Sequence, residues 1–127
     1  MSEILVHLHI DVWKSEKPEV SWVRVTRRTN QSIKYEVRTA KKGGLRVEER
    51  SLSRRWIGRV NPDWRHPNPC GVVDMYWCQD DREPIHGGMV YNMAMIDAMA
   101  RIDADMQAAA IRVREMKEAL YEGGGIE

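Results

Sequence analysis

Long hydrophobic runs are absent from this sequence. Hydrophobic residues make up 43% and charged residues 31% of its 127 residues, which is the composition of an ordinary globular domain. No stretch approaches the roughly 18 consecutive apolar residues that a membrane span requires, and the N-terminus lacks the basic and apolar regions of a secretion signal. We therefore expect a single soluble domain in the cytoplasm, with no membrane partner.

Cysteine is scarce. Cys70 and Cys78 are the two cysteines, and they lie only eight positions apart. A disulfide between them would close a short loop and could not hold the whole fold together. We expect both thiols to be reduced.

The motifs of the common enzyme classes are missing as well. The sequence contains no phosphate-binding P-loop, no serine nucleophile elbow, no HExxH helix and no glycine fingerprint of a dinucleotide site. Their absence favours a binding protein over an enzyme, and we expect no cofactor.

Net charge is also close to zero, but its distribution is uneven. Residues 1–70 carry 15 Lys and Arg against 8 Asp and Glu, a balance of +7, whereas residues 71–127 carry 5 against 11, a balance of −6, and together these make the net +1. Such polarity concerns the choice of partners rather than the fold.

Alternating hydrophobic residues predict an antiparallel meander in residues 1–50. The first strand is the clearest, because every second residue from Ile4 to Val12 is apolar. Short polar turns separate the later strands, and Lys42-Gly43-Gly44 forms one of these turns. The predicted strands are residues 4–12, 20–28, 33–39 and 45–49.

Residues 51–88 are predicted to be loop-rich, because several prolines and glycines interrupt any regular element. Within this segment, residues 72–78 have the composition to add a short fifth strand. Trp56, Trp64 and Trp77 are expected to attach the loop to the core, since large aromatic rings bury much area.

One long helix is predicted over residues 89–121. This stretch has no proline or glycine and is rich in alanine, methionine, arginine and glutamate, which favour helices. Three glycines then end the helix and leave residues 122–127 as a flexible tail. Eight apolar residues follow the 3,4 spacing that is typical of a coiled-coil seam; they are Met95, Met99, Ile102, Met106, Ala109, Val113, Met116 and Leu120.

The length of this helix predicts a partner. At 1.5 Å per residue it measures roughly 50 Å, whereas a compact domain of this size is roughly 36 Å across. The second half should overhang the sheet, and a second copy of the same helix is the simplest cover for its apolar stripe. We therefore expect an α+β homodimer, with a four- or five-stranded meander and a helix that packs on the sheet and on a partner helix. In the alternative, the helix kinks and folds back on the sheet.

Two groups of residues are candidate metal sites. His66, Cys70, Cys78 and His86 offer zinc ligands, but their spacing matches no common zinc finger or ribbon. His7, His9 and Asp11 lie on one face of the first strand and would suit a metal or an acid–base pair. In both groups we favour ordinary buried cysteines and polar surface residues, and we expect no metal.

Basic and aromatic residues in the first half predict a binding surface. The candidate partner-binding residues are Trp22, Arg24, Arg54, Arg55, Arg59 and Arg65. Arginine and tryptophan together suit a phosphate backbone and unpaired bases. The competing interpretation is that Glu36, Glu48 and Glu49 neutralise the sheet through cross-strand pairs.

These observations favour a non-enzymatic, homodimeric binding protein. Its most favoured function is that of an inhibitor or adaptor that binds a protein or nucleoprotein complex. The alternative is an accessory protein that binds nucleic acid through the basic half.

Overall fold

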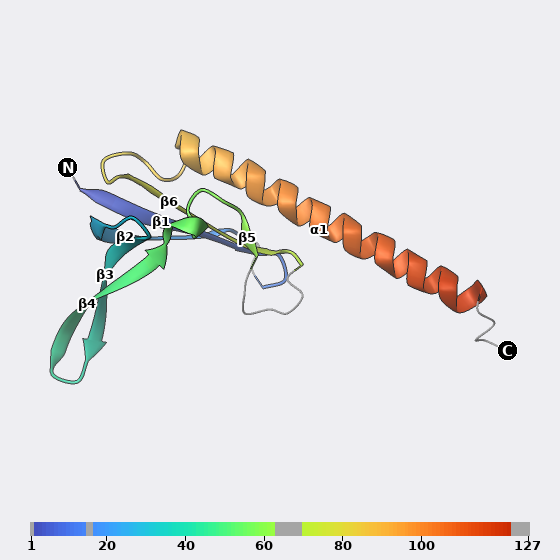
Figure 1. Cartoon of the computed structure of the whole chain (residues 1–127), viewed down its shortest axis with the longest axis horizontal. Coiled ribbons are helices and arrows are strands. Elements are labelled where there is room, and N and C mark those ends of the chain that lie inside the picture. The colour runs from blue at the N-terminus through green and yellow to red at the C-terminus, as the bar shows by residue number, and fades with distance from the viewer. Residues whose placement is uncertain (1, 15–16, 63–69, 123–127) are drawn as a thin grey trace.

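The structure is a computed structural model of the chain and describes residues 2–14, 17–62 and 70–122. Strands come first and one long helix comes last (Figure 1). This order confirms the predicted α+β class. The elements are β1 (Glu3–Asp11), β2 (Glu19–Arg28), β3 (Ser32–Lys41), β4 (Gly44–Ser53), the 3-10 helix η1 (Arg54–Trp56), β5 (Asn61–Pro62), β6 (Val72–Asp80) and α1 (Met89–Glu122).

The strands form one sheet in the order β4-β3-β2-β1-β6-β5, and all neighbouring strands are antiparallel. Strands β1 to β4 follow one another in space as in the sequence, so the predicted meander is confirmed. Gly43 and Gly44 have φ angles of 104° and 132°, a backbone conformation that glycine adopts without strain. These two residues allow the tight turn from β3 into β4.

The predicted loop-rich segment, residues 51–88, is more regular than expected. It contains all of β6, which pairs with β1 from Val72 opposite Asp11 to Asp80 opposite Glu3. The suggested fifth strand is confirmed, and it extends two residues further than predicted. Both faces of β6 are largely buried, so its sequence is an almost continuous apolar run rather than a clear alternation.

The core lies between one face of the sheet and the first half of α1. Alternate residues of β1 and β6, including Val6, Leu8 and Val73, pack against Ala94 and Ala98 of the helix. The small alanine side chains let the helix backbone approach the sheet closely. Of the three tryptophans predicted to attach the loop, Trp77 lies in this core, Trp56 is half-buried, and Trp64 lies outside the described residues.

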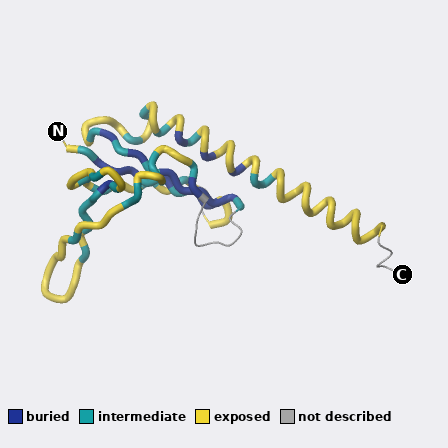
Figure 2. Tube along the Cα trace, viewed as in Figure 1, coloured by how far each residue is buried: buried dark blue, intermediate teal, exposed yellow. Residues whose placement is uncertain are grey.

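The second half of α1 leaves the sheet. From residue 107 to residue 122 every residue is exposed, and Figures 1 and 2 show this part extending away from the body as a straight rod. The predicted overhang is confirmed, and the helix does not fold back. In the part of the chain that the structure describes, no helix is long and apolar enough to cross a membrane.

Strand β2 changes partner along its length. Residues 19–24 pair with β1, whereas the pairs with β3 begin at Val25 opposite Tyr35, and the register shifts between Val25 and Arg27. The β3–β4 hairpin therefore diverges from β2 and projects from the rest of the sheet (Figure 1).

Candidate functional site

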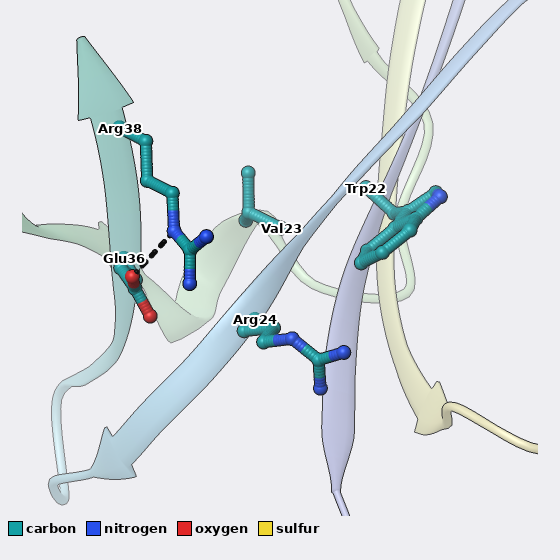
Figure 3. Close-up of a pocket in the computed structure, with 5 residues that line it drawn as sticks. All are labelled: Trp22, Val23, Arg24, Glu36 and Arg38. Atoms are coloured by element: carbon teal, nitrogen blue, oxygen red, sulfur yellow. Dashed lines mark hydrogen bonds and ion pairs between the residues drawn. The ribbon is translucent and has the colours of Figure 1, made fainter. Parts of the chain in front are cut away.

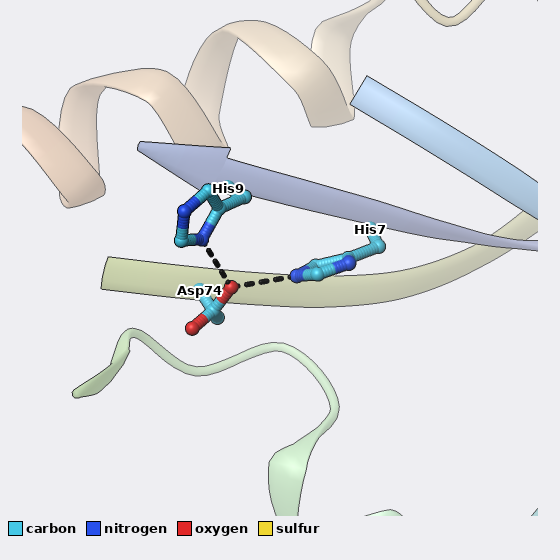
Figure 4. Close-up of side chains that lie close together, drawn as sticks. All are labelled: His7, His9 and Asp74. Carbon is cyan, nitrogen blue, oxygen red and sulfur yellow. Dashed lines mark hydrogen bonds and ion pairs between the residues drawn. The ribbon is translucent and has the colours of Figure 1, made fainter. Parts of the chain in front are cut away.

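Two histidines and an aspartate meet on the face of the sheet opposite α1 (Figure 4). His7 and His9 are two residues apart on β1, so their side chains share a face, and Asp74 of β6 stands opposite His9. Asp74 Oδ1 accepts hydrogen bonds from His7 Nε2 at 2.7 Å and from His9 Nδ1 at 2.8 Å. A single carboxylate oxygen therefore holds both rings.

The environment keeps this carboxyl group charged. Burial alone would raise the pKa of Asp74, but the hydrogen bonds from His7 and His9, with their charges, outweigh burial and lower the pKa below its usual value. An ionised carboxylate can only accept hydrogen bonds, so the ring nitrogens that face it carry protons. His7 also stacks on Tyr76, with ring centroids 4.4 Å apart and planes tilted by 13°.

Two of these three residues belong to the group that the sequence placed on one face of the first strand, where a polar surface was the favoured interpretation. His7 and His9 do share a face, but Asp11 does not join them, because its carboxylate accepts the backbone N–H of Trp13 at 3.0 Å. The carboxylate in the group comes instead from Asp74, which lies on β6, 65 positions after His9 in the sequence. One signal in the sequence could have identified it, since Asp74 is the single charged residue between Val72 and Gln79.

A small pocket adjoins His7. Its volume is about 230 Å³, and it is lined by residues of five strands, among them His7, Ser21 and Tyr76. Tyr35 and Leu52 of the β3–β4 hairpin line another side. The divergence of the hairpin from β2 therefore helps to shape the space beside the histidine.

Of the four candidate zinc ligands, the three that lie in the described residues are not brought together. Cys70 precedes β6 and Cys78 lies near its far end, and the strand from Val72 to Cys78 spans roughly 20 Å at 3.3 Å per residue. Both are free thiols, and burial raises the pKa of Cys78. His86 packs against Tyr91 of α1, and His66 lies outside the described residues. Because an extended strand separates the two sulfur atoms, the cysteines cannot ligate one ion.

A second pocket lies where β2 and β3 diverge (Figure 3). It has a volume of about 450 Å³ and is lined by Trp22, Val23 and Arg24 of β2 and by Glu36 and Arg38 of β3. The Arg24 guanidinium lies 6.0 Å from the centroid of the Trp22 ring, which is itself half-exposed. Arg38 Nε donates to Glu36 at 2.9 Å. The pocket thus combines an aromatic ring with charges of both signs.

The other predicted partner-binding arginines follow β4. Arg54 and Arg55 lie in η1, Arg59 lies just beyond it, and Arg65 is outside the described residues. The Arg55 guanidinium lies 4.6 Å from the centroid of the Trp56 ring. Within the described residues, no ion pair involves Arg54, Arg55 or Arg59.

The structure does not bring Arg54 onto one surface with Trp22 and Arg24. Trp22 and Arg24 stand opposite Val6 and Ile4, whose side chains face α1. Arg54 instead lies close enough to Cys78 to affect the pKa of that thiol. Cys78 stands opposite Leu5, on the other face of the sheet.

Many arginines of the meander are paired with glutamates. Each of the three glutamates predicted to neutralise the sheet forms an ion pair. Some pairs join different strands, as expected, while others join residues of the same strand. The pairs are Arg27–Glu49, Lys41–Glu48, Arg38–Glu36, Arg46–Glu48 and Arg50–Glu48.

The structure divides the predicted helix seam into two parts. Ile102 is buried in the core of its own chain, and Met95 and Met106 pack against that core. The dimer interface predicted at Ile102 is therefore corrected, because a side chain with 5% exposure has almost no surface left for a second chain. The remaining seam residues are exposed: Met99, Ala109, Val113, Met116 and Leu120.

The chain was compared with protein families, curated proteins and solved structures. It matches no family model, no curated protein sequence and no solved structure.

Proposed function

We propose that this protein is a non-enzymatic, cytoplasmic binding protein that acts as a homodimer and binds a protein or nucleoprotein complex as an inhibitor or adaptor. The observation that carries the proposal is the distal helix, by which we mean residues 107–122 of α1. All of its residues are exposed and none of them contributes to the core. A surface of this kind is suited to packing against another chain.

Helix energetics support a cover for the distal helix. Most helical stability in proteins comes from tertiary packing of one face of the helix, and the distal helix, roughly 24 Å long, has no packing from its own sheet. Val113, Met116 and Leu120 are 52%, 71% and 55% exposed and continue the 3,4 spacing of a coiled-coil seam. Burying such side chains contributes about 1.5–3 kcal/mol each.

Charge favours a second copy as that cover. The distal helix carries three basic and three acidic residues, so its net charge is zero, and two copies do not repel one another through net charge. These residues are Arg112, Arg114, Lys117, Glu115, Glu118 and Glu122.

The sheet surface supports a protein as the target. Arginines that are already paired with glutamates are less available to phosphates, and the pocket between β2 and β3 presents Trp22 beside Arg24 and Arg38. Tryptophan and arginine are the residue types enriched at the centres of protein interfaces. We infer that this pocket receives part of the protein target.

Sedimentation analysis tests the dimer. The wild-type chain is expected to be dimeric at micromolar concentration, and Val113→Glu with Leu120→Glu is expected to be monomeric with an unchanged circular dichroism spectrum of the sheet. Met106 is left intact, because it packs against the core. Ile96→Glu is the matched control, since Ile96 is 68% exposed on the first half of α1 and lies outside the seam. A monomeric wild type, or a dimer that only Ile96→Glu disrupts, would contradict the proposal.

A second function is favoured by Arg54, Arg55 and Arg59, which take part in no ion pair of the described residues, and by the stacking of Arg55 on Trp56. These residues could bind nucleic acid. Binding of generic DNA or RNA that weakens steeply with salt, and that is lost when the three arginines become glutamate, would support this alternative. Wild type without any affinity for nucleic acid, together with nuclease-resistant capture of one host protein, would support the protein target.

A further inference from the structure

We propose that His7, His9 and Asp74 form a binding site for one divalent transition-metal ion of the zinc class. Two imidazoles and one carboxylate are donors that Zn²⁺ and its neighbours in the first transition row prefer. Their ligand atoms all lie within 4.8 Å of one another. Harder ions such as Ca²⁺ prefer about six to eight oxygen ligands, which this group does not supply.

Paired strands hold the three donors. His7 and His9 lie on β1 and Asp74 lies on β6, in the register that pairs these two strands along their whole length. Stacking of His7 on Tyr76 orients one ring further. The backbone positions are therefore already in place before an ion binds, and only side chains need to move.

The required movement is small. With metal–ligand distances of about 2.1 Å, two ligand atoms of a tetrahedral zinc site are about 3.4 Å apart. The two nitrogens here lie 2.7 and 2.8 Å from Asp74 Oδ1, so each of these two separations must grow by about 0.6–0.7 Å. The ligand atoms all lie within 4.8 Å of one another, so the two nitrogens must approach each other by at most about 1.4 Å. Rotation of the carboxylate or of a ring provides this movement. The ion then lies between the groups, and one metal–nitrogen bond and one metal–oxygen bond replace each direct N–H···O hydrogen bond.

Metal binding requires the two ring nitrogens that face Asp74 to lose their protons. Each ring nitrogen that faces the carboxylate carries a proton before binding, and a metal needs the lone pair of that nitrogen. A neutral imidazole supplies this lone pair by keeping its one proton on the other ring nitrogen, Nδ1 of His7 or Nε2 of His9. An imidazolium releases one proton to solvent and reaches the same state.

Access comes from the histidine side. The side chains of His7 and His9 are 34% and 20% exposed, whereas that of Asp74 is 11% exposed. An ion can therefore enter over the rings, while the carboxylate lies beneath them. Three protein ligands leave a fourth position open, and the pocket beside His7 gives room for water or for an oxygen or nitrogen atom of a bound partner.

Titration of Zn²⁺ into the full-length chain tests the site. The protein is purified without a histidine tag, stripped with chelator and titrated by calorimetry, and about one ion per chain is expected. His7→Gln and His9→Gln should each weaken the affinity by at least about tenfold, since even groups that only orient ligands contribute about that much. His86→Gln is the matched control, because His86 lies against Tyr91 and away from the site.

A second readout makes the test independent of stability. Co²⁺ bound by two imidazoles and a carboxylate should show visible absorption bands that His7→Gln and His9→Gln lose and His86→Gln retains. The test uses variants of the partly exposed histidines, and circular dichroism checks that these variants fold. It therefore remains valid even if Asp74→Asn does not fold. Absence of Zn²⁺ binding by the wild type would overturn the proposed site. A Zn²⁺ affinity of the His7→Gln and His9→Gln variants equal to that of the wild type would overturn it as well. The result does not depend on the dimer, which is measured separately.

Discussion

The two halves of α1 are one continuous helix with two different sources of stability. Residues 89–106 bury Ala94, Ala98 and Ile102 against the sheet, whereas residues 107–122 are exposed on every face. Both halves consist of good helix formers, so helix propensity does not distinguish them. The comparison shows that a helix can continue past its own core when its sequence favours it, and that the surface of the continuation then stays exposed.

The largest expected effect comes from placing a charge in each half. Ala98 has 0% exposure, so Ala98→Glu buries an unpaired carboxylate and should cost at least about 3 kcal/mol, against a total of about 5–15 kcal/mol for a domain. We expect the midpoint of the unfolding transition in urea to fall sharply. Ala108→Glu, on the exposed half and outside the seam, should change the free energy of unfolding of the body by less than about 0.5 kcal/mol. Equal destabilisation by both variants would abolish the distinction between the halves.

The next largest effect on stability is expected from replacing one of two isoleucines of α1, one on each half, by alanine. Ile102 is 5% exposed and Ile111 is 48% exposed. Ile102→Ala should lower the free energy of unfolding by about 2–5 kcal/mol, because it leaves a cavity in the core. Ile111→Ala should change it by less than about 0.5 kcal/mol, since Ile111 has no core contact and lies outside the seam. Urea titrations of the two variants measure this difference, and a larger loss for Ile111→Ala would show that another surface covers that side of the helix.

Truncation should have a smaller effect on the body. A chain that stops after Met106 keeps every core residue of the described structure, so its free energy of unfolding should change by less than about 1 kcal/mol. Its mass by light scattering should be that of a monomer. An unfolded sheet in the truncated chain would mean that the distal helix stabilises the body and not only the dimer.

The smallest effect leaves the average structure unchanged. Backbone amides of residues 107–122 should exchange with deuterium faster than those around Ala98, because an unpacked helix opens locally with little cost. Their protection should increase with protein concentration in the wild type, since in the proposed dimer a second chain covers them. Hydrogen exchange measured by mass spectrometry at two protein concentrations checks this prediction. Protection that does not depend on concentration would mean that the helix is stable without a second chain, which would contradict the dimer.

Much of the fold could be predicted because its signals are local. The alternation through Ile4, Val6 and Leu8 predicted a strand with one buried face, and these residues do form the core. The helix was predicted over residues 89–121 and extends over Met89–Glu122, since a run without proline or glycine needs no distant contact to indicate its bounds. β6 was predicted only in part, because a strand buried on both faces loses its alternation.

The binding surfaces were less predictable. Trp22 and Arg24 were grouped with Arg54 and Arg55 because all lie in the basic half of the sequence. The strand register places Trp22 and Arg24 on the face that α1 covers, whereas Arg54 lies near Cys78 on the other face. Composition records which residues are present in a segment and not which face of a twisted sheet they occupy.

The sequence by itself determined the strands of the meander, the long helix and the pairing of His7 with His9 on one face, because each depends on spacing along a short stretch of chain. Only the tertiary structure decided that Asp74, rather than Asp11, completes that group. The reason is register: β1 and β6 are neighbours in the sheet although His9 and Asp74 lie 65 positions apart in the sequence, and a shift of one residue between the strands would turn Asp74 to the face of the sheet that α1 covers.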